Sequence, residues 1–229
     1  MSNKLTLEQR IERLEAAVEI QNLMSKYQYL HSAYMNEKIV ELFADRDDVT
    51  IDAPFGKWSG LDAVRRCFGV LFEKDLTPRD LRGELVEHTL TTPIIEVAGD
   101  ARTAKVVWNS PGFEAHKFFW VEGSPHIAFW NWLKYSVDFI RTDKGWRIWH
   151  LRIYTTFASD YNTSCVDGEH PPEPPLNAGK ARFNEPPAAS TRYSKDRAPQ
   201  LIPVPPEPYD TYEQGTDGAP ERAALPTGQ

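Results

Sequence analysis

The sequence predicts an α+β fold in which a long N-terminal helix lies across a curved antiparallel sheet. Apolar residues recur three or four positions apart in the first part of the chain, as they do on amphipathic helices. Beyond Glu84 the pattern changes to β-branched and aromatic runs that are separated by Gly-containing turns. Helices followed by meandering strands place the helices on one face of a sheet. A strongly curved sheet that closes over a helix makes a cone with a pocket inside it.

The first helix is expected over residues 7–34. Thr6 and Gln9 fit a capping box, in which a hydroxyl and an amide serve the free N–H groups at the helix start. The apolar residues that follow at helical spacing are Ile11, Leu14, Val18, Ile20, Leu23 and Met24.

The end of this helix carries polar aromatic side chains. Extending the apolar stripe leads to Tyr27, His31 and Tyr34, so an apolar face ends in two phenols and an imidazole. Such residues either pack in a core by their ring faces or line a cavity where their polar atoms do chemistry. Three of them on one face favour the cavity.

Short elements are expected next: a helix over 37–43, a hairpin over 49–59, and a helix after Gly60 with apolar residues at helical spacing. Residues 75–82 are polar and irregular. A strand is expected over 84–97 with a break at Pro93, and a turn at 99–100 leads into a strand over 104–108.

Residues 110–125 read as a loop that is rich in aromatic residues. Eight of the 23 residues from 113 to 135 are Phe, Trp or Tyr. The loop either packs on itself at the surface, or presents a wall or lid to a flat apolar ligand or to a neighbouring subunit. Strands over 127–141 and 146–157, joined by a hairpin turn, complete the sheet.

The chain divides into a domain over 1–160 and a Pro-rich tail over 161–229. Thirteen of the 18 prolines but only four of the 27 aromatic residues follow Cys165, so the tail cannot build a core. Its proline clusters at 171–175 and 203–208 should be extended. Apolar and aromatic residues are spaced along it like anchors: Phe183, Tyr193, Leu201, Ile202, Val204, Tyr209 and Tyr212. We therefore expect the tail to pack on the domain or on a neighbouring subunit of a homo-oligomer, a dimer or trimer.

The composition excludes several classes of partner. A net charge of −7 and a pI of about 5.4 argue against a nucleic-acid-binding protein. No apolar run approaches transmembrane length and no secretory signal is recognisable, so a cytoplasmic protein without a membrane partner is expected. Cys67 and Cys165 are too few for a disulfide framework, and no zinc spacing or phosphate-binding Gly motif occurs. We expect no metal and no cofactor.

Without a cofactor, side chains must drive any reaction, and proton transfer by His is the obvious type. His116 and His126 in or beside the aromatic loop, and His170 in the tail, are expected at the surface. His150 reads as a core residue of the last strand.

Two cations lie in the predicted strands. Lys134 stands among aromatic residues and either reaches solvent or faces the pocket as an anion acceptor. The two-residue period of a strand groups Trp132 with Lys134, but which face is interior stays open. Arg152 carries the same ambiguity.

Two segments carry a family resemblance. "ELFADRDDVTIDAPFGKWSG" at 41–60 and "YSVDFIRTDKGWRI" at 135–148, in this order of elements, resemble the SnoaL-like branch of the nuclear-transport-factor-2-like fold. The resemblance covers about residues 7–157 and implies a cone-shaped α+β domain. The fold hosts dehydratases, isomerases, dehydrochlorinases and binding proteins, so it implies no single activity.

The resemblance also implies a site. In lyase-type members a His at the start of a long strand acts as base, and "EHTLTTPIIEV" gives that role to His88. An Asp near the end of the first helix orients the base, but this sequence has His31 there. A His–His pair lacks the negative partner that stabilises an imidazolium. Lys26 or Tyr27 takes the place of a cationic or phenolic residue one or two turns earlier.

Residues and resemblance together give the candidate site. The catalytic candidates are His88, His31, Tyr34, Tyr27 and Lys134, and the substrate-binding candidates are Lys26, Tyr29, Trp108, Phe129, Trp132 and Arg152.

Chain length and the aromatic loop further resemble cofactor-independent lyases that act on lignin-derived diarylpropane dimers, releasing formaldehyde and leaving a stilbene. This implies a small hydroxylated aromatic substrate. The alternatives are a dehydratase or isomerase of a polycyclic or steroid-like substrate, and a ligand-binding or assembly module without catalysis. Only the last predicts that His31 and His88 can be replaced without loss of biological output.

Overall fold

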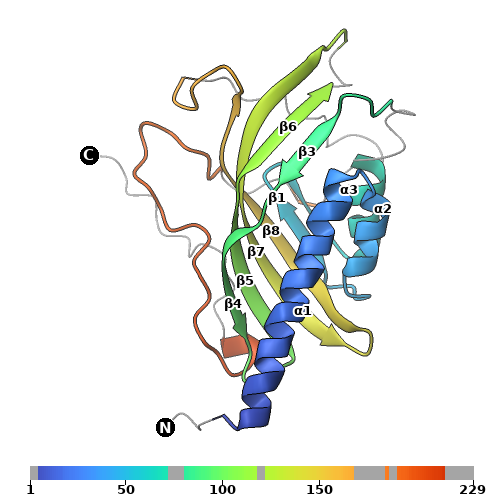
Figure 1. Cartoon of the computed structure of the whole chain (residues 1–229), viewed down its shortest axis with the longest axis vertical. Helices are drawn as coiled ribbons and strands as arrows, with labels where there is room; N and C mark the ends of the chain where they lie inside the picture. Colours follow the sequence, from blue (N-terminus) through green and yellow to red (C-terminus); the bar gives the residue numbers. More distant parts are fainter. Residues whose placement is uncertain (1–4, 72–79, 118–121, 168–183, 186–189, 215–229) are drawn as a thin grey trace.

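The computed structural model describes residues 5–71, 80–117, 122–167, 184–185 and 190–214. A curved eight-stranded sheet forms the centre, with helices on one face and the C-terminal segment over the other (Figure 1). We call these the helix face and the tail face of the sheet. The α+β architecture expected from the sequence is confirmed. No helix in the described part of the chain is both long and apolar enough to cross a membrane.

Helix α1 spans Leu7–Ser32 and begins at the predicted capping box. The Thr6 N–H donates to the Gln9 side chain at 2.9 Å, and the Gln9 N–H donates to the Thr6 hydroxyl at 3.2 Å. The helix ends two residues earlier than predicted, because Tyr34 adopts the left-handed φ of 55°.

The two halves of α1 differ in what they bury. Ala16, Ile20, Met24 and Tyr27 pack into the core, as the amphipathic pattern predicts. The apolar residues of the first half are not buried: Leu7, Ile11, Leu14 and Val18 are 70%, 46%, 69% and 61% exposed. The prediction of a single buried stripe is therefore wrong for this half, where the stripe faces outward.

The remaining helices close the helix face. They are α2 (Asn36–Ile39), the 3₁₀ turn η1 (Val40–Leu42) and α3 (Leu61–Leu71), with a further 3₁₀ turn η3 (Tyr212–Gln214) in the tail. The Phe68 ring of α3 lies 6.0 Å from Phe43 and 5.9 Å from Tyr27. These ring contacts join α3 to α1 across the core.

The sheet contains β1 (Thr50–Ala53), β2 (Gly56–Ser59), β3 (Leu85–His88), β4 (Thr91–Val97), β5 (Thr103–Ser110), β6 (Gly112–Lys117), β7 (His126–Thr142) and β8 (Gly145–Asp160). The strand order is β2-β1-β8-β7-β5-β4, and β6 joins β7 to β3. Strand β1 pairs parallel with β8, so the sheet is mixed rather than wholly antiparallel as predicted. Parallel pairing is possible because the long connection over residues 54–144 separates the two strands in the chain.

Two differences from the predicted strands shape the site. The aromatic segment expected as a loop contains β6, since aromatic residues suit a strand as well as a loop. The strand expected over 84–97 divides into β3 and β4 after His88, and the irregularity expected at Pro93 is a register shift between Thr91 and Ile94, where Thr92 has a φ of 47°. As a result β3 pairs with β6, while β4 pairs with β5.

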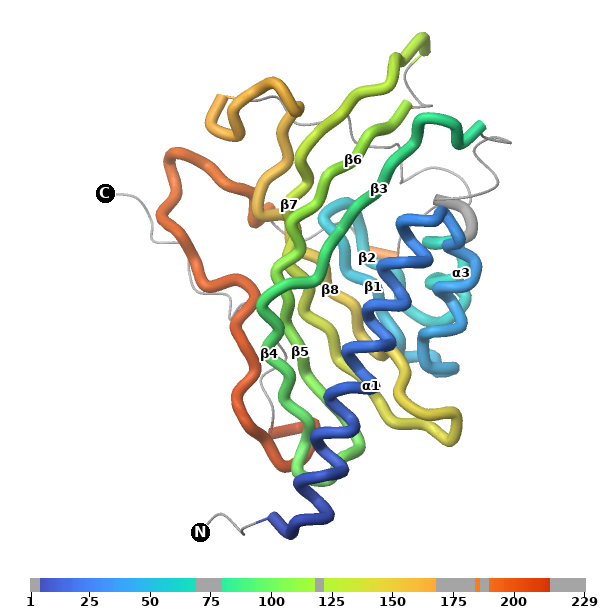
Figure 2. Tube along the Cα trace, in the orientation of Figure 1, coloured from blue at the N-terminus to red at the C-terminus, as the bar shows by residue number. Residues whose placement is uncertain are grey.

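The tail follows the face of the sheet opposite the helices (Figure 2). The Glu185 carbonyl accepts the Lys57 N–H at 3.0 Å, and the Thr156 carbonyl accepts the Tyr193 N–H at 2.7 Å. Farther on, the Gly99 N–H donates to the Tyr209 carbonyl at 2.9 Å. Residues 201–211 form no helix or strand, and the proline cluster at 171–175 lies outside the described residues.

Candidate active site

A buried group of imidazoles and carboxylates lies where the end of α1 meets β3, β6 and β7. The rings of His31 and His88 stack with centroids 6.3 Å apart and planes at 22°. On its other side His31 stacks on Tyr27 at 6.1 Å. His31 of the helix stripe and His88, expected at a strand start and found at the end of β3, thus lie together here. We call this group, with Tyr34, Glu84, Glu114, His116 and Asn131, the imidazole cluster.

Glu114 of β6 stands at the centre of the cluster. Its Oε1 accepts the Nε2–H of His88 at 2.9 Å and the side-chain amide of Asn131 at 2.6 Å. Its Oε2 accepts the Nε2–H of His116 at 2.8 Å. With three donors on two oxygens, the carboxylate is held as an acceptor only and stays ionised. Glu114 gives His88 the negative partner that a His–His pair lacks.

His116 links this carboxylate to a second one. Its Nδ1–H donates to Glu84 Oε2 at 2.9 Å, and the Tyr34 hydroxyl lies 3.0 Å from the same nitrogen and 3.3 Å from Glu84. Both ring nitrogens of His116 therefore face carboxylate oxygens, which is the arrangement of an imidazolium. The expectation of a surface role for His116 was wrong, because β6 turns this side chain inward and only 14% of it is exposed.

The environment separates the pKa values of these groups. Burial acts most strongly on His116 and would lower its pKa, but hydrogen bonds and charges from Glu114 and Glu84 together raise the pKa. Burial likewise opposes ionisation of Glu114, yet hydrogen bonds from His116 and His88 hold its pKa well below the usual range. The cluster thus holds an internal ion pair.

His31 has the opposite character. Its pKa is lowered to about 4, chiefly by burial and also by the neighbouring His88, against the opposing effect of a hydrogen bond to Asn36. The Nδ1–H of His31 donates to Asn36 Oδ1 at 2.7 Å. His31 is therefore neutral near pH 7, beside an imidazolium at His116.

Gly112 sets the position of His88. The two residues are paired across β3 and β6, and a Cβ on Gly112 would lie 2.2 Å from His88 Nδ1 and 2.5 Å from the Asn131 carbonyl oxygen. Only glycine allows the imidazole to lie against the backbone here. His88 Nδ1 is buried and has no hydrogen-bond partner among the described residues.

The predicted site residues divide into two sets. His31, His88, Tyr27 and Tyr34 lie together in or against the cluster, and the Phe129 ring lies 5.7 Å from His116. Trp108 is buried on the helix face, where its Nε1–H donates to Gln21 at 3.1 Å.

The other predicted residues lie elsewhere. On β7, Asn131 faces the cluster, and the two-residue period therefore turns Trp132 and Lys134 to the tail face. Arg152 lies on that face too, where it donates to Asp138 at 3.2 Å. Lys26 and Tyr29 point to solvent from α1, with Tyr29 81% exposed. These five residues are not brought to the imidazole cluster.

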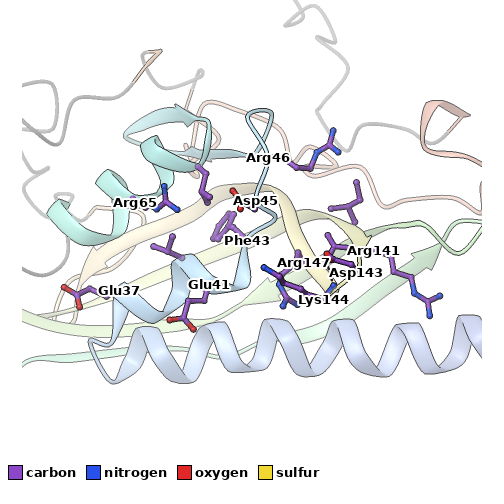
Figure 3. Close-up of a pocket in the computed structure, with 14 residues that line it drawn as sticks. Glu37, Glu41, Phe43, Asp45, Arg46, Arg65, Arg141, Asp143, Lys144 and Arg147 are labelled. Carbon is purple, nitrogen blue, oxygen red and sulfur yellow. Dashed lines mark hydrogen bonds between the residues drawn. The ribbon is translucent and has the colours of Figure 1, made fainter.

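A pocket of about 1080 Å³ opens at the opposite end of β7, beside the β7–β8 hairpin (Figure 3). Its charged lining residues are Glu37, Glu41, Asp45, Arg46, Arg65, Arg141, Asp143, Lys144 and Arg147. Acidic and basic groups are nearly balanced there, and Arg46 and Arg65 are paired with Asp48 and Asp62. We therefore place the candidate active site at the imidazole cluster, where ionisable groups are buried and coupled.

Sequence reasoning missed Glu84, Glu114 and Asn131. A two-residue alternation over Glu114 and His116 was the available signal, but it carries weight only if the segment is a strand. Among the described residues, no group of three or more His, Cys, Asp or Glu side chains is arranged to hold a metal ion.

Comparison with known proteins places the chain in a family. The model of the SnoaL-like domain matches residues 12–152, and a search of the curated proteins finds no match. The solved structure of LinA has 15% sequence identity and a TM-score of 0.53, covering 72% of this chain and 99% of its own. A candidate scytalone dehydratase from Novosphingobium aromaticivorans has 15% identity and a TM-score of 0.50, covering 72% and 97%.

A third solved structure, an NTF2-like protein from Novosphingobium aromaticivorans, has 21% identity and a TM-score of 0.44, covering 72% of this chain and 94% of its own. Because the family model spans more than half of the residues, and the architecture agrees with the first two structures, the chain belongs to the SnoaL-like domain family and has the nuclear-transport-factor-2-like fold.

Proposed function

We propose that the protein is a cofactor-independent lyase that acts on a hydroxylated aromatic substrate by general acid–base chemistry. The observation that carries this is Glu114, one buried carboxylate that orients His88 and also holds the imidazolium of His116. Groups that differ in protonation but lie in one cluster can give and take protons in the same reaction.

His88 serves as the base in this proposal. Its Nε2–H is fixed on Glu114, so Nδ1 is the nitrogen that carries the lone pair. When Nδ1 takes a proton, Glu114 stabilises the resulting imidazolium, as a carboxylate does in hydrolytic triads. His31 remains neutral beside it, since two stacked imidazoles disfavour a second charge.

His116 and Tyr34 serve as the acid. The phenol lies between His116 and Glu84, so a proton that Tyr34 gives to a leaving hydroxyl can be replaced from His116. Tyr27 and Phe129 supply flat apolar surface beside the imidazoles.

The specific reaction that we propose acts on a diarylpropane with a benzylic hydroxyl and a neighbouring hydroxymethyl group. The acid protonates the benzylic hydroxyl, which leaves as water and gives a quinone methide as the para phenolate donates electrons. The base then removes the hydroxymethyl O–H proton, the C–C bond breaks, and formaldehyde leaves. The electron pair of the broken C–C bond forms the stilbene double bond, and the quinone methide becomes a phenolate again. One diol gives one stilbene, one formaldehyde and one water, with no net oxidation.

The decisive experiment measures formaldehyde and stilbene from a panel of phenolic diarylpropanes. We expect turnover by the wild type and a loss of roughly 10²–10⁴-fold in His88→Gln, the usual weight of a general base. Folding of the variant is checked by circular dichroism. A folded His88→Gln protein with normal turnover would contradict the assignment of His88.

The product analysis separates the alternative activities. A dehydratase needs the same acid and base, so loss of water without formaldehyde identifies a dehydratase, and rearrangement without loss of either identifies an isomerase. Ligand binding with no conversion, and unchanged binding by His31→Gln and His88→Gln, identifies a binding module.

A further inference from the structure

A second set of polar side chains lies inside the same interior and takes no part in the imidazole cluster. Gln28 of α1 is 7% exposed and Ser110 of β5 is fully buried. Among the described residues, neither amide atom of Gln28 nor the hydroxyl of Ser110 has a hydrogen-bond partner. Buried polar groups are almost always paired, so three unpaired atoms in one region indicate a partner that binds there.

The two side chains converge on Tyr135 of β7. Burial, the largest effect, raises the pKa of Tyr135 to about 12, and the nearby polar side chains of Gln28 and Ser110 offset part of this rise. Trp108 pairs with Tyr135 and Ser110 with Leu133, which puts Ser110 and Tyr135 on the same face of the sheet. Tyr135 keeps its proton at neutral pH and can donate it in a hydrogen bond.

The ring of Tyr27 lies between these three side chains and the imidazoles. Tyr27 contacts both groups, with its ring centroid 6.1 Å from His31 and 6.4 Å from Tyr135. Gln28 precedes His31 by one helical turn on α1. Ser110 comes two residues before Gly112, against which His88 lies.

We propose that Gln28, Ser110 and Tyr135 form a subsite that binds the free phenolic oxygen of the substrate and stabilises its phenolate. Each of the three offers a donor from an N–H or O–H, and donors aimed at one oxygen in a dry site favour its anionic form. The phenolic proton passes to solvent. This inference rests on the proposed function for its context and narrows the substrate class to aryl compounds with an unmethylated para hydroxyl.

The test uses 4-nitrophenol, whose phenolate form absorbs visible light and so reports its own ionisation. We expect the wild type to bind it with the pKa of the bound phenol below that of the free phenol. Ser110→Ala, Gln28→Leu and Tyr135→Phe should each weaken binding roughly tenfold and raise the pKa of the bound phenol. Tyr154→Phe is the matched control, because Tyr154 pairs with Lys134 on the tail face. It should change neither the affinity for the probe nor the pKa of the bound phenol. The O-methylated probe should not bind.

The outcomes separate the subsite from the catalytic proposal. Three results overturn the subsite: the protein binds only the protonated phenol, it does not bind the probe, or all variants bind the probe equally. In each case the unpaired atoms of Gln28 and Ser110 bind water only. His88→Gln should bind the probe as the wild type does while losing turnover. If probe binding behaves as expected but no phenolic dimer is converted, the subsite stands and the lyase proposal fails.

An independent observation concerns the outward face of α1. Leu7, Ile11, Leu14 and Val18 are spaced 4-3-4, the spacing of the contact positions of a coiled coil, and all are exposed. In Figure 1 this half of the helix runs along the edge of the molecule, beyond α2 and α3. We call these four residues the α1 seam.

Charges beside the seam identify the occupant. Glu12 and Arg13 turn toward the body, where they pair with Arg141 and Glu96. Arg10 and Glu15 flank the seam on opposite sides and are exposed. In a parallel pair of such helices, Arg10 of one copy lies opposite Glu15 of the other, twice by symmetry. An antiparallel pair sets the acidic flanks, Glu8 and Glu15, against each other.

We infer that the α1 seam binds a second copy of this chain in a parallel homodimer. Sedimentation or light scattering should find a dimer that Leu14→Glu converts to a monomer. Arg10→Glu should weaken the dimer at least tenfold, and the double variant Arg10→Glu/Glu15→Arg should restore it. Lys144→Glu, on the distant hairpin, is the control. A wild-type monomer, a trimer, or a dimer that survives Leu14→Glu overturns this inference.

Discussion

At the scale of single residues, Glu114 decides whether the imidazoles can act. A Gln at this position keeps the shape but replaces one acceptor oxygen with an NH₂ group that faces N–H donors. We expect Glu114→Gln to lower turnover by roughly 10²–10⁴-fold, as loss of the partner does in related acid–base pairs. Glu87→Gln, an exposed neighbour on β3, should leave turnover unchanged. Equal rates in the two variants would contradict the role of Glu114.

His31 makes stability depend on pH in a defined direction. Its pKa falls from 6.5 in the unfolded chain to about 4 in the fold, so the unfolded state binds more protons between these values. The native state is therefore destabilised as the pH falls from about 6.5 to 4, and His31→Gln should remove this part of the loss. Allowing for its partial exposure, the difference should be roughly 2–3 kcal/mol.

The measurement is urea unfolding of both proteins across this pH range. The other groups of the imidazole cluster are the same in both proteins, so the difference between the curves reports on His31. Parallel curves would show that His31 keeps an ordinary pKa in the fold.

Gly112 and Gly99 offer a matched pair of substitutions. In Gly112→Ala the new Cβ meets His88 at 2.2 Å, whereas in Gly99→Ala it meets Asp210 of the tail at 2.9 Å. We expect Gly112→Ala to lower the free energy of unfolding by about 1–3 kcal/mol and to remove most of the turnover. Gly99→Ala should weaken the packing of the tail but retain turnover. Thermal melts and rates of both variants check this. Full activity in Gly112→Ala would show that His88 has room to move.

At the scale of elements, the sequence predicted the helices and the long hairpin but not the strand that completes the site. His31 and His88 could be found because each lies on an element with a clear period. Glu114 reaches His88 only through the β3–β6 pairing, which joins residues 26 positions apart. Local pattern carries no information about which strand lies beside which.

The faces of β7 show the same limit. Alternation groups Trp132 with Lys134 and Phe129 with Asn131, but both groups contain aromatic and polar residues. Here the tail covers one face and α1 the other, so both faces are partly buried. A strand that is buried on both faces lacks the clean polar alternation from which an interior face can be read.

At the scale of the whole molecule, the tail completes the sheet rather than extending away from it. Asp138 on the tail face is 2% exposed and accepts hydrogen bonds from His150 at 2.8 Å and from the Tyr212 hydroxyl at 2.9 Å. Lys105, 3.7 Å from Asp138, lies 3.9 Å from the centre of the Tyr212 ring. The last described part of the chain thus covers charged groups that the sheet alone would leave open.

Removing the tail should therefore weaken the domain. In a chain that ends after residue 165, Lys105 and Asp138 lose Tyr212, and the backbone N–H groups of Gly99 and Asp100 lose the carbonyls of Tyr209 and Asp210. The apolar surface that buries Tyr209 is also exposed to water. We expect a clear fall in melting temperature. Turnover should persist at low temperature, because the imidazole cluster lies on the helix face.

A chain that ends after Gln214 keeps every one of these contacts and is the control for truncation itself. Tyr212→Phe removes a single hydrogen bond and should cost about 1 kcal/mol, a fraction of the full effect. Calorimetry of the two truncated chains, of Tyr212→Phe and of the wild type gives their melting temperatures. We expect the melting temperature to fall as more contacts between tail and sheet are lost. If the chain ending at residue 165 melts at the wild-type temperature, the contacts between tail and sheet contribute no stability, and the tail must serve elsewhere.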